Sequence, residues 1–165
     1  MSTIRGRVRK FGDNIDTDTV APGPSLQLPP EEMKKHAFAP VFPDFWKTVA
    51  EGDVIVGGSN FGCGSSREQA AQVVKDLGIR IVVADSIARI FYRNCIALGL
   101  YPIAAKGASS LFKEGDEIEI DLDNGRIRNA ATGVELSFEA LSESQKAILK
   151  EGGILPLLKS LTEKG

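Results

Sequence analysis

The sequence is poor in the side chains that bind soft metals or form cross-links. Its 165 residues include two cysteines, Cys63 and Cys95, and one histidine, His36. The cysteines are 32 positions apart and form no CxxC pair, so we expect neither a disulfide framework nor a zinc site. An iron–sulfur cluster needs about three or four thiolates. We therefore expect this chain to bind no metal or cofactor by itself.

Neither sign of charge is in large excess, and no apolar run is long. Twenty Lys and Arg residues stand against 22 Asp and Glu, a net charge of −2, so nucleic acid is not an expected partner. The longest apolar runs, such as residues 81–84, are far below the roughly 18 residues of a membrane span, so no membrane association is expected. Residues 1–7 lack the apolar stretch of a signal peptide, and we expect a cytoplasmic location.

The remaining composition is that of a soluble protein with a sizeable core, with 42% hydrophobic and 25% charged residues. The length fits one ordinary domain, so residues 1–165 are expected to form a single α/β domain. Elements alternate through the middle of the chain: a strand at 53–57, a helix at 67–77, a strand at 79–84, a helix at 86–98 and a strand at 101–104. This alternation is typical of βαβ units around a parallel sheet.

The two ends of the chain have other patterns. Residues 4–11 alternate between apolar and basic, which predicts a strand with one wet face. Residues 116–128 predict a hairpin, and residues 134–138 a further strand. Ser142 and Gln145 have the spacing of a capping box, so a helix should begin there and end at Gly152-Gly153.

A proline-rich loop separates the first strand from the parallel units. Residues 21–30 contain four prolines, a density that excludes both a helix interior and a central strand. Two leucines, Leu26 and Leu28, nevertheless lie within it. The loop is followed at 30–36 by a short helix with its acids first and its bases last, as the helix dipole favours.

The segment at 57–68 differs from the rest of the chain. Four glycines fall within eight residues between a strand and a helix, and glycine lets the backbone approach a ligand closely. The helix that follows offers unpaired N–H groups to an anion. Arg67, expected in its first turn, opposes the helix dipole but has bidentate geometry for a carboxylate. The segment therefore predicts a carboxylate-binding site.

Simpler interpretations of the same residues stay open. Ser65 and Glu68 have capping-box spacing, so Ser65 could be a helix cap. Cys63 could be an activated thiolate or a small buried residue. The pattern is neither of the two common nucleotide-binding glycine motifs. It is not the GxSxG motif of hydrolases either, and His36 has no obvious acid partner.

Residues 60–68, Asn-Phe-Gly-Cys-Gly-Ser-Ser-Arg-Glu, closely resemble the signature of the small subunit of isopropylmalate dehydratase and of the swivelling domain of the aconitase superfamily. The resemblance extends to residues 12–18, 88–94, 115–116 and 151–153, in the same order. It implies a compact swivelling β/β/α domain of the aconitase C-terminal type, with a mobile proline-rich loop. It also implies a hydro-lyase whose large subunit holds a [4Fe–4S] cluster and joins this chain in a heterodimer or heterotetramer.

The resemblance also implies roles for individual residues. Ser65 would be the base, acting as an alkoxide, while Ser66 and Arg67 would bind a substrate carboxylate. A serine alkoxide needs stabilisation, for which Arg67, the helix dipole and nearby N–H groups are candidates. Asp18 would support a histidine of the large subunit. Asp16 is the weaker choice for that role, and an ordinary turn-forming aspartate is the alternative for either position.

The chain departs from many relatives in the proline-rich loop and at Gln69, where many have histidine. The Arg-Tyr pair of those relatives is replaced here by Pro24-Ser25. In this family the loop contacts the variable substituent of the substrate, which assigns specificity to Ser25, Leu26, Gln27 and Leu28. We expect the loop to be poorly ordered alone and to fold over the substrate in the complex. The alternative is that both leucines pack on the domain itself or on the large subunit.

An uncharged loop favours a substrate with an apolar substituent. The expected reaction is the interconversion of 3-isopropylmalate and 2-isopropylmalate in leucine biosynthesis. A methyl-substituted malate, homoaconitate or another substrate of an aconitase-like hydratase is the alternative. A non-catalytic carboxylate-binding module is the alternative from a different class.

Overall fold

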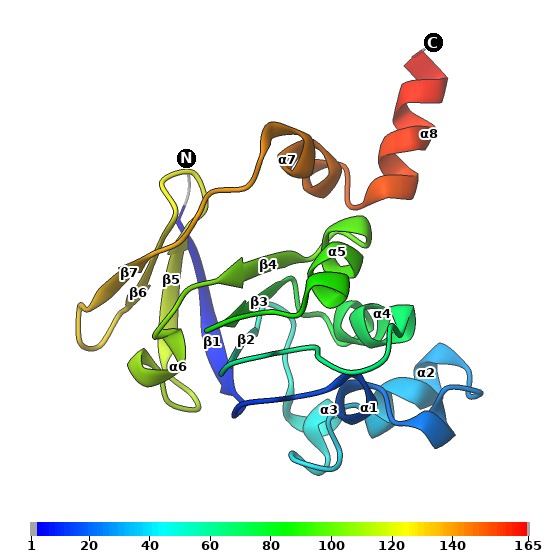
Figure 1. The fold of residues 1–165 in the computed structure, drawn as a ribbon, viewed down its shortest axis with the longest axis horizontal. Helices are drawn as coiled ribbons and strands as arrows, with labels where there is room; N and C mark the ends of the chain where they lie inside the picture. Colours follow the sequence, from blue (N-terminus) through cyan, green and yellow to red (C-terminus); the bar gives the residue numbers. More distant parts are fainter. Residues whose placement is uncertain (1–2, 165) are drawn as a thin grey trace.

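Seven strands form one curled, mixed sheet in the computed structural model, which describes residues 3–164 (Figure 1). The strands are β1 (Ile4–Lys10), β2 (Val54–Gly57), β3 (Ile81–Ala84), β4 (Tyr101–Ala104), β5 (Glu117–Asp121), β6 (Arg126–Asn129) and β7 (Glu135–Ser137). Across the sheet they lie in the order β4-β3-β2-β1-β5-β6-β7. β1 to β4 are parallel, and β5 to β7 continue from β1 as antiparallel neighbours. The expected parallel units and hairpin are both confirmed, and they share one sheet.

Helices occupy the connections between the strands. They are α1 (Thr17–Val20), α2 (Pro30–Met33), α3 (Phe45–Thr48), α4 (Glu68–Asp76), α5 (Arg89–Ala97), α6 (Ala108–Leu111), α7 (Glu143–Lys150) and α8 (Ile154–Lys164), with single 3-10 turns η1 (Gly23–Ser25) and η2 (Lys34–His36). α4 and α5 lie next to each other beside β2 and β3, whereas α8 points away from the body of the molecule (Figure 1).

The parallel strands are apolar throughout because both of their faces are buried. Ile55 of β2 and Val82 of β3 pack into a core with α4 and α5. Their neighbours Val54 and Val83 pack into a second core against the β5–β6 hairpin. Every side chain of the four-residue strands β2 and β3 is buried in one of the two cores, and this burial fixes the position of the strands.

Helix boundaries differ from the sequence expectation by a few residues. α4 begins at Glu68 and α5 at Arg89, one and three positions later than expected. The expected capping box is confirmed, with the backbone N–H of Gln145 donating to the Ser142 hydroxyl at 3.2 Å. Helix α8 is an element that the sequence pattern did not predict. Within residues 3–164, no helix is long and apolar enough to cross a membrane.

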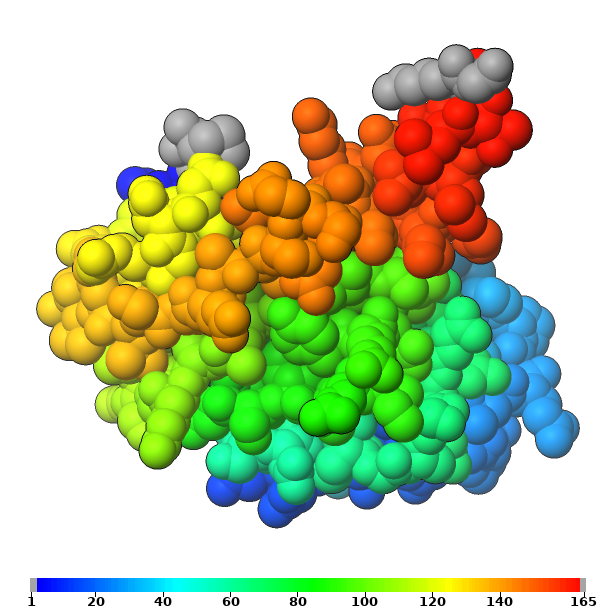
Figure 2. Space-filling view, turned by 45° about the horizontal axis from the view of Figure 1, so that its top comes forward, coloured from blue at the N-terminus to red at the C-terminus, as the bar shows by residue number. Residues whose placement is uncertain are grey.

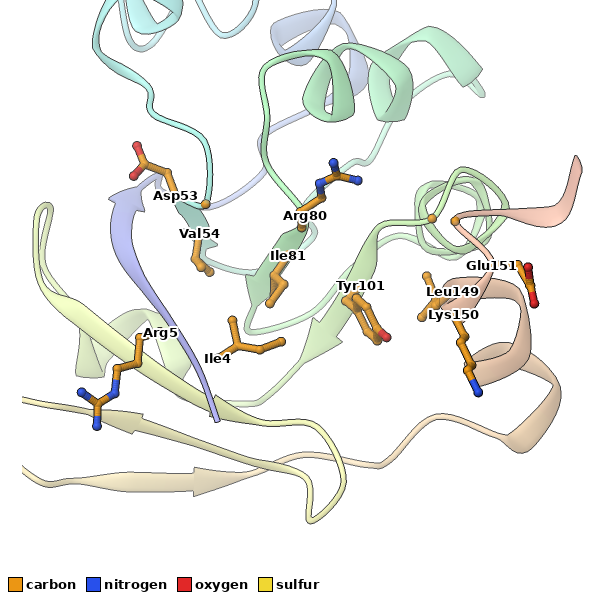
Figure 3. Close-up of a pocket in the computed structure, with 13 residues that line it drawn as sticks. Ile4, Arg5, Asp53, Val54, Arg80, Ile81, Tyr101, Leu149, Lys150 and Glu151 are labelled. Carbon is orange, nitrogen blue, oxygen red and sulfur yellow. The ribbon is translucent and has the colours of Figure 1, made fainter. Parts of the chain in front are cut away.

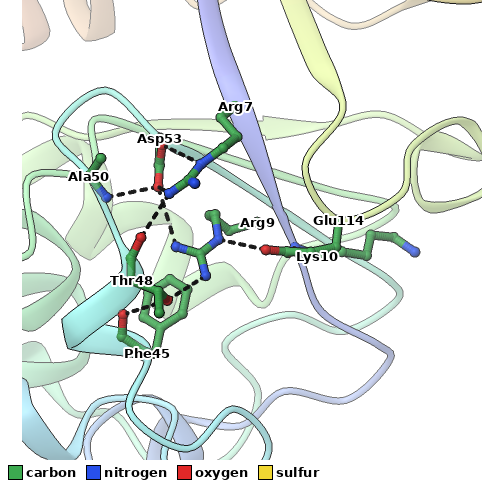
Figure 4. A network of polar contacts seen from close by, with 8 residues as sticks. All are labelled: Arg7, Arg9, Lys10, Phe45, Thr48, Ala50, Asp53 and Glu114. Atoms are coloured by element: carbon green, nitrogen blue, oxygen red, sulfur yellow. Dashed lines mark hydrogen bonds and ion pairs between the residues drawn. The ribbon is translucent and has the colours of Figure 1, made fainter.

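Strand β1 has one solvent-exposed face in its first half, at Arg5 and Arg7, but not in its second half. The expectation of an exposed basic face along residues 4–11 is therefore wrong at Arg9. The Arg9 side chain is 2% exposed and donates to Asp53 at 3.3 Å and to Glu114 at 2.8 Å. Its guanidinium also lies over the ring of Phe45, 4.6 Å from the centroid (Figure 4). A buried arginine is tolerated because carboxylates and an aromatic ring replace its water.

Asp53 is the centre of this network. It accepts from Arg7 at 2.7 Å, from Arg9 and from the backbone N–H of Ala50 (Figure 4). Burial by itself raises the pKa of Asp53, but the hydrogen bonds from Arg7, Ala50 and Arg9 outweigh burial and hold the pKa below its ordinary value. The carboxylate therefore fastens β1 to the chain segment that leads into β2.

Candidate functional site

The glycine-rich segment lies at the carboxyl edge of the parallel strands, the usual place for ligands in such sheets. Beyond the strands, parallel pairing continues as isolated bridges between Asp16 and Cys63 and between Phe61 and Ile87. The backbone N–H of Thr17 donates to the carbonyl of Cys63 at 2.8 Å. The chain segments that follow β1, β2 and β3 are thereby held side by side.

Two glycines in the segment are required by close packing. At Gly62 φ is +80°, and an added Cβ would lie 2.3 Å from Cγ of Phe91. At Gly58 an added Cβ would lie 1.9 Å from Oδ1 of Asp13, the oxygen that accepts the N–H of Ser59 at 2.8 Å. Larger side chains at either position would push the segment away from its neighbours.

A cavity of about 190 Å³ opens where these segments meet. It is lined by Thr17, Gly62, Gly64, Ser65, Ser66, Arg67, Ala88, Arg89, Ile90, Phe91 and Asn94. The N-cap residue of α4, Arg67, and the first turn of α5 border it. Ser65 and Ser66 are exposed, and the hydroxyl of buried Thr17 donates to the Ser65 carbonyl at 2.8 Å. The Thr17 and Ser65 hydroxyl oxygens are 3.5 Å apart.

Ser65 is not the cap of α4, so that interpretation is wrong. The N-cap of α4 is Arg67, which has extended backbone angles and makes no side-chain capping bond. The capping-box spacing of Ser65 and Glu68 is thus a coincidence of sequence. Ser65 instead lines the cavity, with its hydroxyl oxygen 3.5 Å from that of Thr17.

Arg67 and Asp18 form the central ion pair of the site. Nη1 of Arg67 donates to Oδ1 of Asp18 at 2.7 Å and to the carbonyl of Ala21 at 3.1 Å. The Gly23 N–H donates to the same Asp18 oxygen at 3.1 Å. The Arg67 hydrogen bond, followed by that from Gly23, holds the pKa of Asp18 below its ordinary value. Arg67 is thus paired with a carboxylate whose ionised form it stabilises.

The structure separates the two aspartates of the motif. Asp16 is the N-cap of α1, with its side chain accepting the N–H of Thr19 at 2.7 Å. The turn-forming interpretation therefore holds for Asp16. Asp18 instead reaches Arg67 and is exposed. Asp18 is accordingly the aspartate that the structure places at the site.

The proline-rich loop adjoins the site without lining the serine cavity. Ser25 is buried, at 3% exposure, and its hydroxyl donates to the Pro22 carbonyl at 2.6 Å, so it fixes the shape of the loop. Leu26 is half-buried against the core, as the alternative interpretation expects for that leucine, whereas Gln27 and Leu28 are exposed. The mobility of the loop stays a prediction.

A separate apolar hollow of about 430 Å³ lies behind this loop. It is lined by Pro22, Pro24, Ser25, Leu28, His36, Ala39 and Pro40. Sequence reasoning treated His36 as a residue of a charged helix and missed this position. No periodicity reveals it, because the contact depends on the path of the whole loop.

A larger cavity lies elsewhere, at the amino edge of the parallel strands (Figure 3). Its volume is about 490 Å³, and Ile4, Ile81 and Tyr101 form its apolar floor while the Arg5 and Lys150 side chains extend away from it. None of residues 57–68 lines it, although Glu151 and Gly152 of the stretch at 151–153 do. Cavity size alone would therefore have pointed away from the glycine-rich segment.

The two cysteines differ in their surroundings. Cys95 is fully buried in α5, and burial raises the pKa of its thiol, which makes it an inert core residue. Cys63 is half-buried. Residues 3–164 contain no group of three or more His, Cys, Asp or Glu side chains that could hold a metal ion.

Fold and site together define a class of protein. Residues 32–108 match the family described as the Aconitase C-terminal domain. The chain is 50% identical to the isopropylmalate/citramalate isomerase small subunit of Methanocaldococcus jannaschii, covering 96% of this chain and 95% of that protein. It is 50% identical to a 3-isopropylmalate dehydratase small subunit of Thermotoga maritima, covering 94% and 95%. It is 47% identical to a methanogen homoaconitase small subunit of M. jannaschii, covering 94% and 91%.

A solved structure agrees with these relatives. The crystal structure of 3-isopropylmalate dehydratase from M. jannaschii superposes with a TM-score of 0.90 at 45% identity, covering 99% of this chain and 100% of that one. The chain belongs to the family of 3-isopropylmalate dehydratase small subunits, within the aconitase superfamily. The resemblance drawn from residues 60–68 is thereby confirmed.

Proposed function

We propose that this chain is the small subunit of a two-subunit hydro-lyase that interconverts 3-isopropylmalate and 2-isopropylmalate in leucine biosynthesis. The reaction removes water from one carbon and returns it to the neighbouring carbon. The supporting observation is the Ser65-Ser66-Arg67 unit at an open cavity, in which both serines are exposed and half-buried Arg67 is paired with Asp18. We place the enzyme in the cytoplasm and assign it a large-subunit partner, as a heterodimer or heterotetramer.

The cluster expected in this family does not fit the residues of this chain. Two thiols, one of them fully buried, are too few to ligate it. We therefore assign the [4Fe–4S] cluster to the large subunit, where it would bind the substrate hydroxyl. What this chain contributes is a base, a carboxylate site and a surface that closes over the substrate.

Ser65 acts in this proposal as the base that takes the proton from the carbon next to a carboxylate. A serine hydroxyl is too weak an acid to ionise in water, so its alkoxide must be stabilised locally. The site offers two contributions: the unpaired N–H groups at the start of α4 and the positive charge of Arg67. Both are fixed before the substrate arrives.

Arg67 has N–H donors that no residue among 3–164 uses and that can bind the substrate. Its Nη1 is used by Asp18 and Ala21, which leaves Nη2 and Nε for a carboxylate. These two nitrogens lie on one edge of the guanidinium and can bind both oxygens of a carboxylate at once. Ser66, exposed beside Arg67, is assigned to the same carboxylate. Asp18 keeps its second oxygen for a histidine of the large subunit.

The uncharged loop supports an alkyl-substituted malate as the substrate. Gln27 and Leu28 are its exposed side chains, and neither would compensate the charge of a third carboxylate. A methyl-substituted malate is the second candidate, because the loop has no feature that requires the longer isopropyl group. A purely carboxylate-binding module is the alternative from another class, and Ser65 distinguishes it, since binding alone needs no base.

The test is reconstitution of this chain with its large subunit under anaerobic conditions. Turnover would be measured on 3-isopropylmalate, citramalate and homoaconitate. We expect kcat/KM to be highest for 3-isopropylmalate and turnover to require both subunits. Turnover by this chain alone, or a preference for homoaconitate, would contradict the proposal.

A further inference from the structure

Helix α5 presents a basic and apolar face beside the serine cavity. Arg89, Ile90 and Arg93 are all exposed, with Ile90 at 51%. Arg89 and Arg93 are four residues apart and so lie on the same face of the helix. In the space-filling view, residues coloured green, α5 among them, occupy the middle of the molecule below α7 and α8 (Figure 2). Nothing in the described chain covers these three side chains.

The positive charge on this face does not stabilise the chain by itself. Six of the nine arginines form ion pairs, namely Arg5, Arg7, Arg9, Arg67, Arg126 and Arg128. Within residues 3–164, Arg89 and Arg93 form neither an ion pair nor a side-chain hydrogen bond. Arg89 is also the first residue of α5, where the helix dipole disfavours a cation and no acidic residue follows in the first turn.

The position of the face indicates what it contacts. Arg89 and Ile90 line the cavity that contains Ser65 and Ser66. In the proposed function the large subunit must cover this cavity, because the cluster and the base act on the same substrate. The α5 face therefore continues directly from the surface that the partner covers.

We infer that Arg89, Ile90 and Arg93 form a docking face for the large subunit, which would present acidic side chains around an apolar contact for Ile90. The inference rests on the proposed function for the existence of that partner. Unpaired arginines at an interface edge accelerate association by attracting an oppositely charged surface. Ile90, exposed in this chain, would become buried in the complex and slow dissociation, because its apolar area is then removed from water.

Arg93→Glu is the sharpest variant, because Arg93 lies outside the cavity lining. The association rate of this chain with the cluster-loaded large subunit would be measured by surface immobilisation at several ionic strengths. We expect the rate to fall by at least about tenfold at low salt and the difference to shrink as salt increases. At saturating large subunit, kcat should equal that of the unchanged pair.

Arg80→Glu is the matched control, because Arg80 is exposed, unpaired within residues 3–164 and located at the opposite edge of the sheet. It should leave the association rate within about twofold of the unchanged chain. Ile90→Ser adds no charge, so it should raise the dissociation rate and leave the salt dependence unchanged. A melting curve for each variant shows that it is folded.

An Arg93→Glu or Ile90→Ser chain that associates as fast and as tightly as the unchanged chain would overturn the inference. Failure of the unchanged subunits to associate would overturn it as well. Salt-dependent loss of association in a pair that never turns over 3-isopropylmalate would support the docking face and contradict the proposed function. The two proposals therefore fail through different measurements.

Discussion

Nη1 of Arg67 lies 2.7 Å from Oδ1 of Asp18, which joins the start of α4 to the turn of α1 across 49 positions of sequence. The same aspartate oxygen accepts the Gly23 N–H, so one carboxylate fixes both the arginine and the beginning of the proline-rich loop. A single residue thereby places both the arginine and the loop that we propose to contact the substrate.

Asp18→Asn should weaken this placement. The amide keeps the size of the carboxylate but loses its charge, so Arg67 and Gly23 are held less firmly. We expect kcat/KM of the reconstituted enzyme to fall by about 10- to 100-fold, the range for misplaced binding groups. The melting temperature should hardly change, because Asp18 is exposed. Asp16→Asn is the matched control and should mainly affect the capping of α1; equal losses from both variants would contradict this role of Asp18.

Ser65→Ala should abolish turnover and leave stability unchanged, because the hydroxyl caps no helix. Ser142→Ala is the matched control, since Ser142 does cap α7. That variant should lose about 1 kcal/mol of unfolding free energy while keeping its turnover. Urea unfolding and turnover measured on the same preparations give both quantities. Substantial turnover of the Ser65→Ala complex would contradict its role as the base.

Asp53→Asn should be strongly destabilising. The change leaves the guanidinium of Arg9 buried beside a neutral amide, and removing one partner of a buried ion pair costs about 3–5 kcal/mol. Glu135→Gln, which breaks the exposed pair with Arg126, should cost less than about 1 kcal/mol. Urea midpoints at constant pH compare the two. A similar small loss from both would show that the Arg9 network contributes little.

The unfolding free energy should also depend on pH through Asp53. The folded-state pKa of Asp53 lies below its unfolded value of about 4, so its stabilisation is fully present above that value. Stability should then be lost as the pH falls from about 4 through the folded-state pKa, because the unfolded chain binds the proton first. Asp53→Asn should flatten this part of the curve of unfolding free energy against pH. An unchanged slope would assign the acid sensitivity to other carboxylates.

Leu28→Arg should change which substrate the enzyme prefers. Leu28 is exposed on the loop, and a cation there would disfavour an alkyl group and attract a third carboxylate. We expect kcat/KM to fall on 3-isopropylmalate and to rise on homoaconitate. Leu26→Arg is a poor substitute, because Leu26 packs against the core and its loss affects stability. Parallel changes on both substrates would show that Leu28 does not contact the variable group.

The sequence pattern correctly predicted those elements that are stabilised by residues close to them in the sequence. The strand at 101–104 has the predicted bounds, and the Ser142 capping box is present as expected. Helix α8 was missed because Gly152-Gly153 indicates an end and Pro156 a break. Proline is nevertheless accepted in the first turn of a helix, where its absent N–H has no intrahelical partner.

Features that depend on distant partners were not predictable in this way. Arg9 sits in an alternating basic pattern that indicates a wet face, yet its partners Asp53 and Glu114 are 44 and 105 positions away. The site itself was found through the motif at 60–68, and spacing alone would have left Ser65 as a cap. Only the backbone angles of Arg67 exclude that interpretation.

The crossover from β1 to β2 has a consequence for how this family diversifies. Residues 11–53 leave one strand and return to its immediate parallel neighbour, so their two ends are fixed by the β1–β2 ladder. The proline-rich loop that we propose to contact the substrate belongs to this stretch, whereas Ser65 follows β2. Asp16, Thr17 and Asp18 also belong to it and contact residues 63, 65 and 67, so only an exchange limited to residues 24–30 leaves those contacts in place. Under the proposed function, substrate preference and chemistry are then encoded by separate pieces of the chain, and duplicated copies can diverge in one while conserving the other.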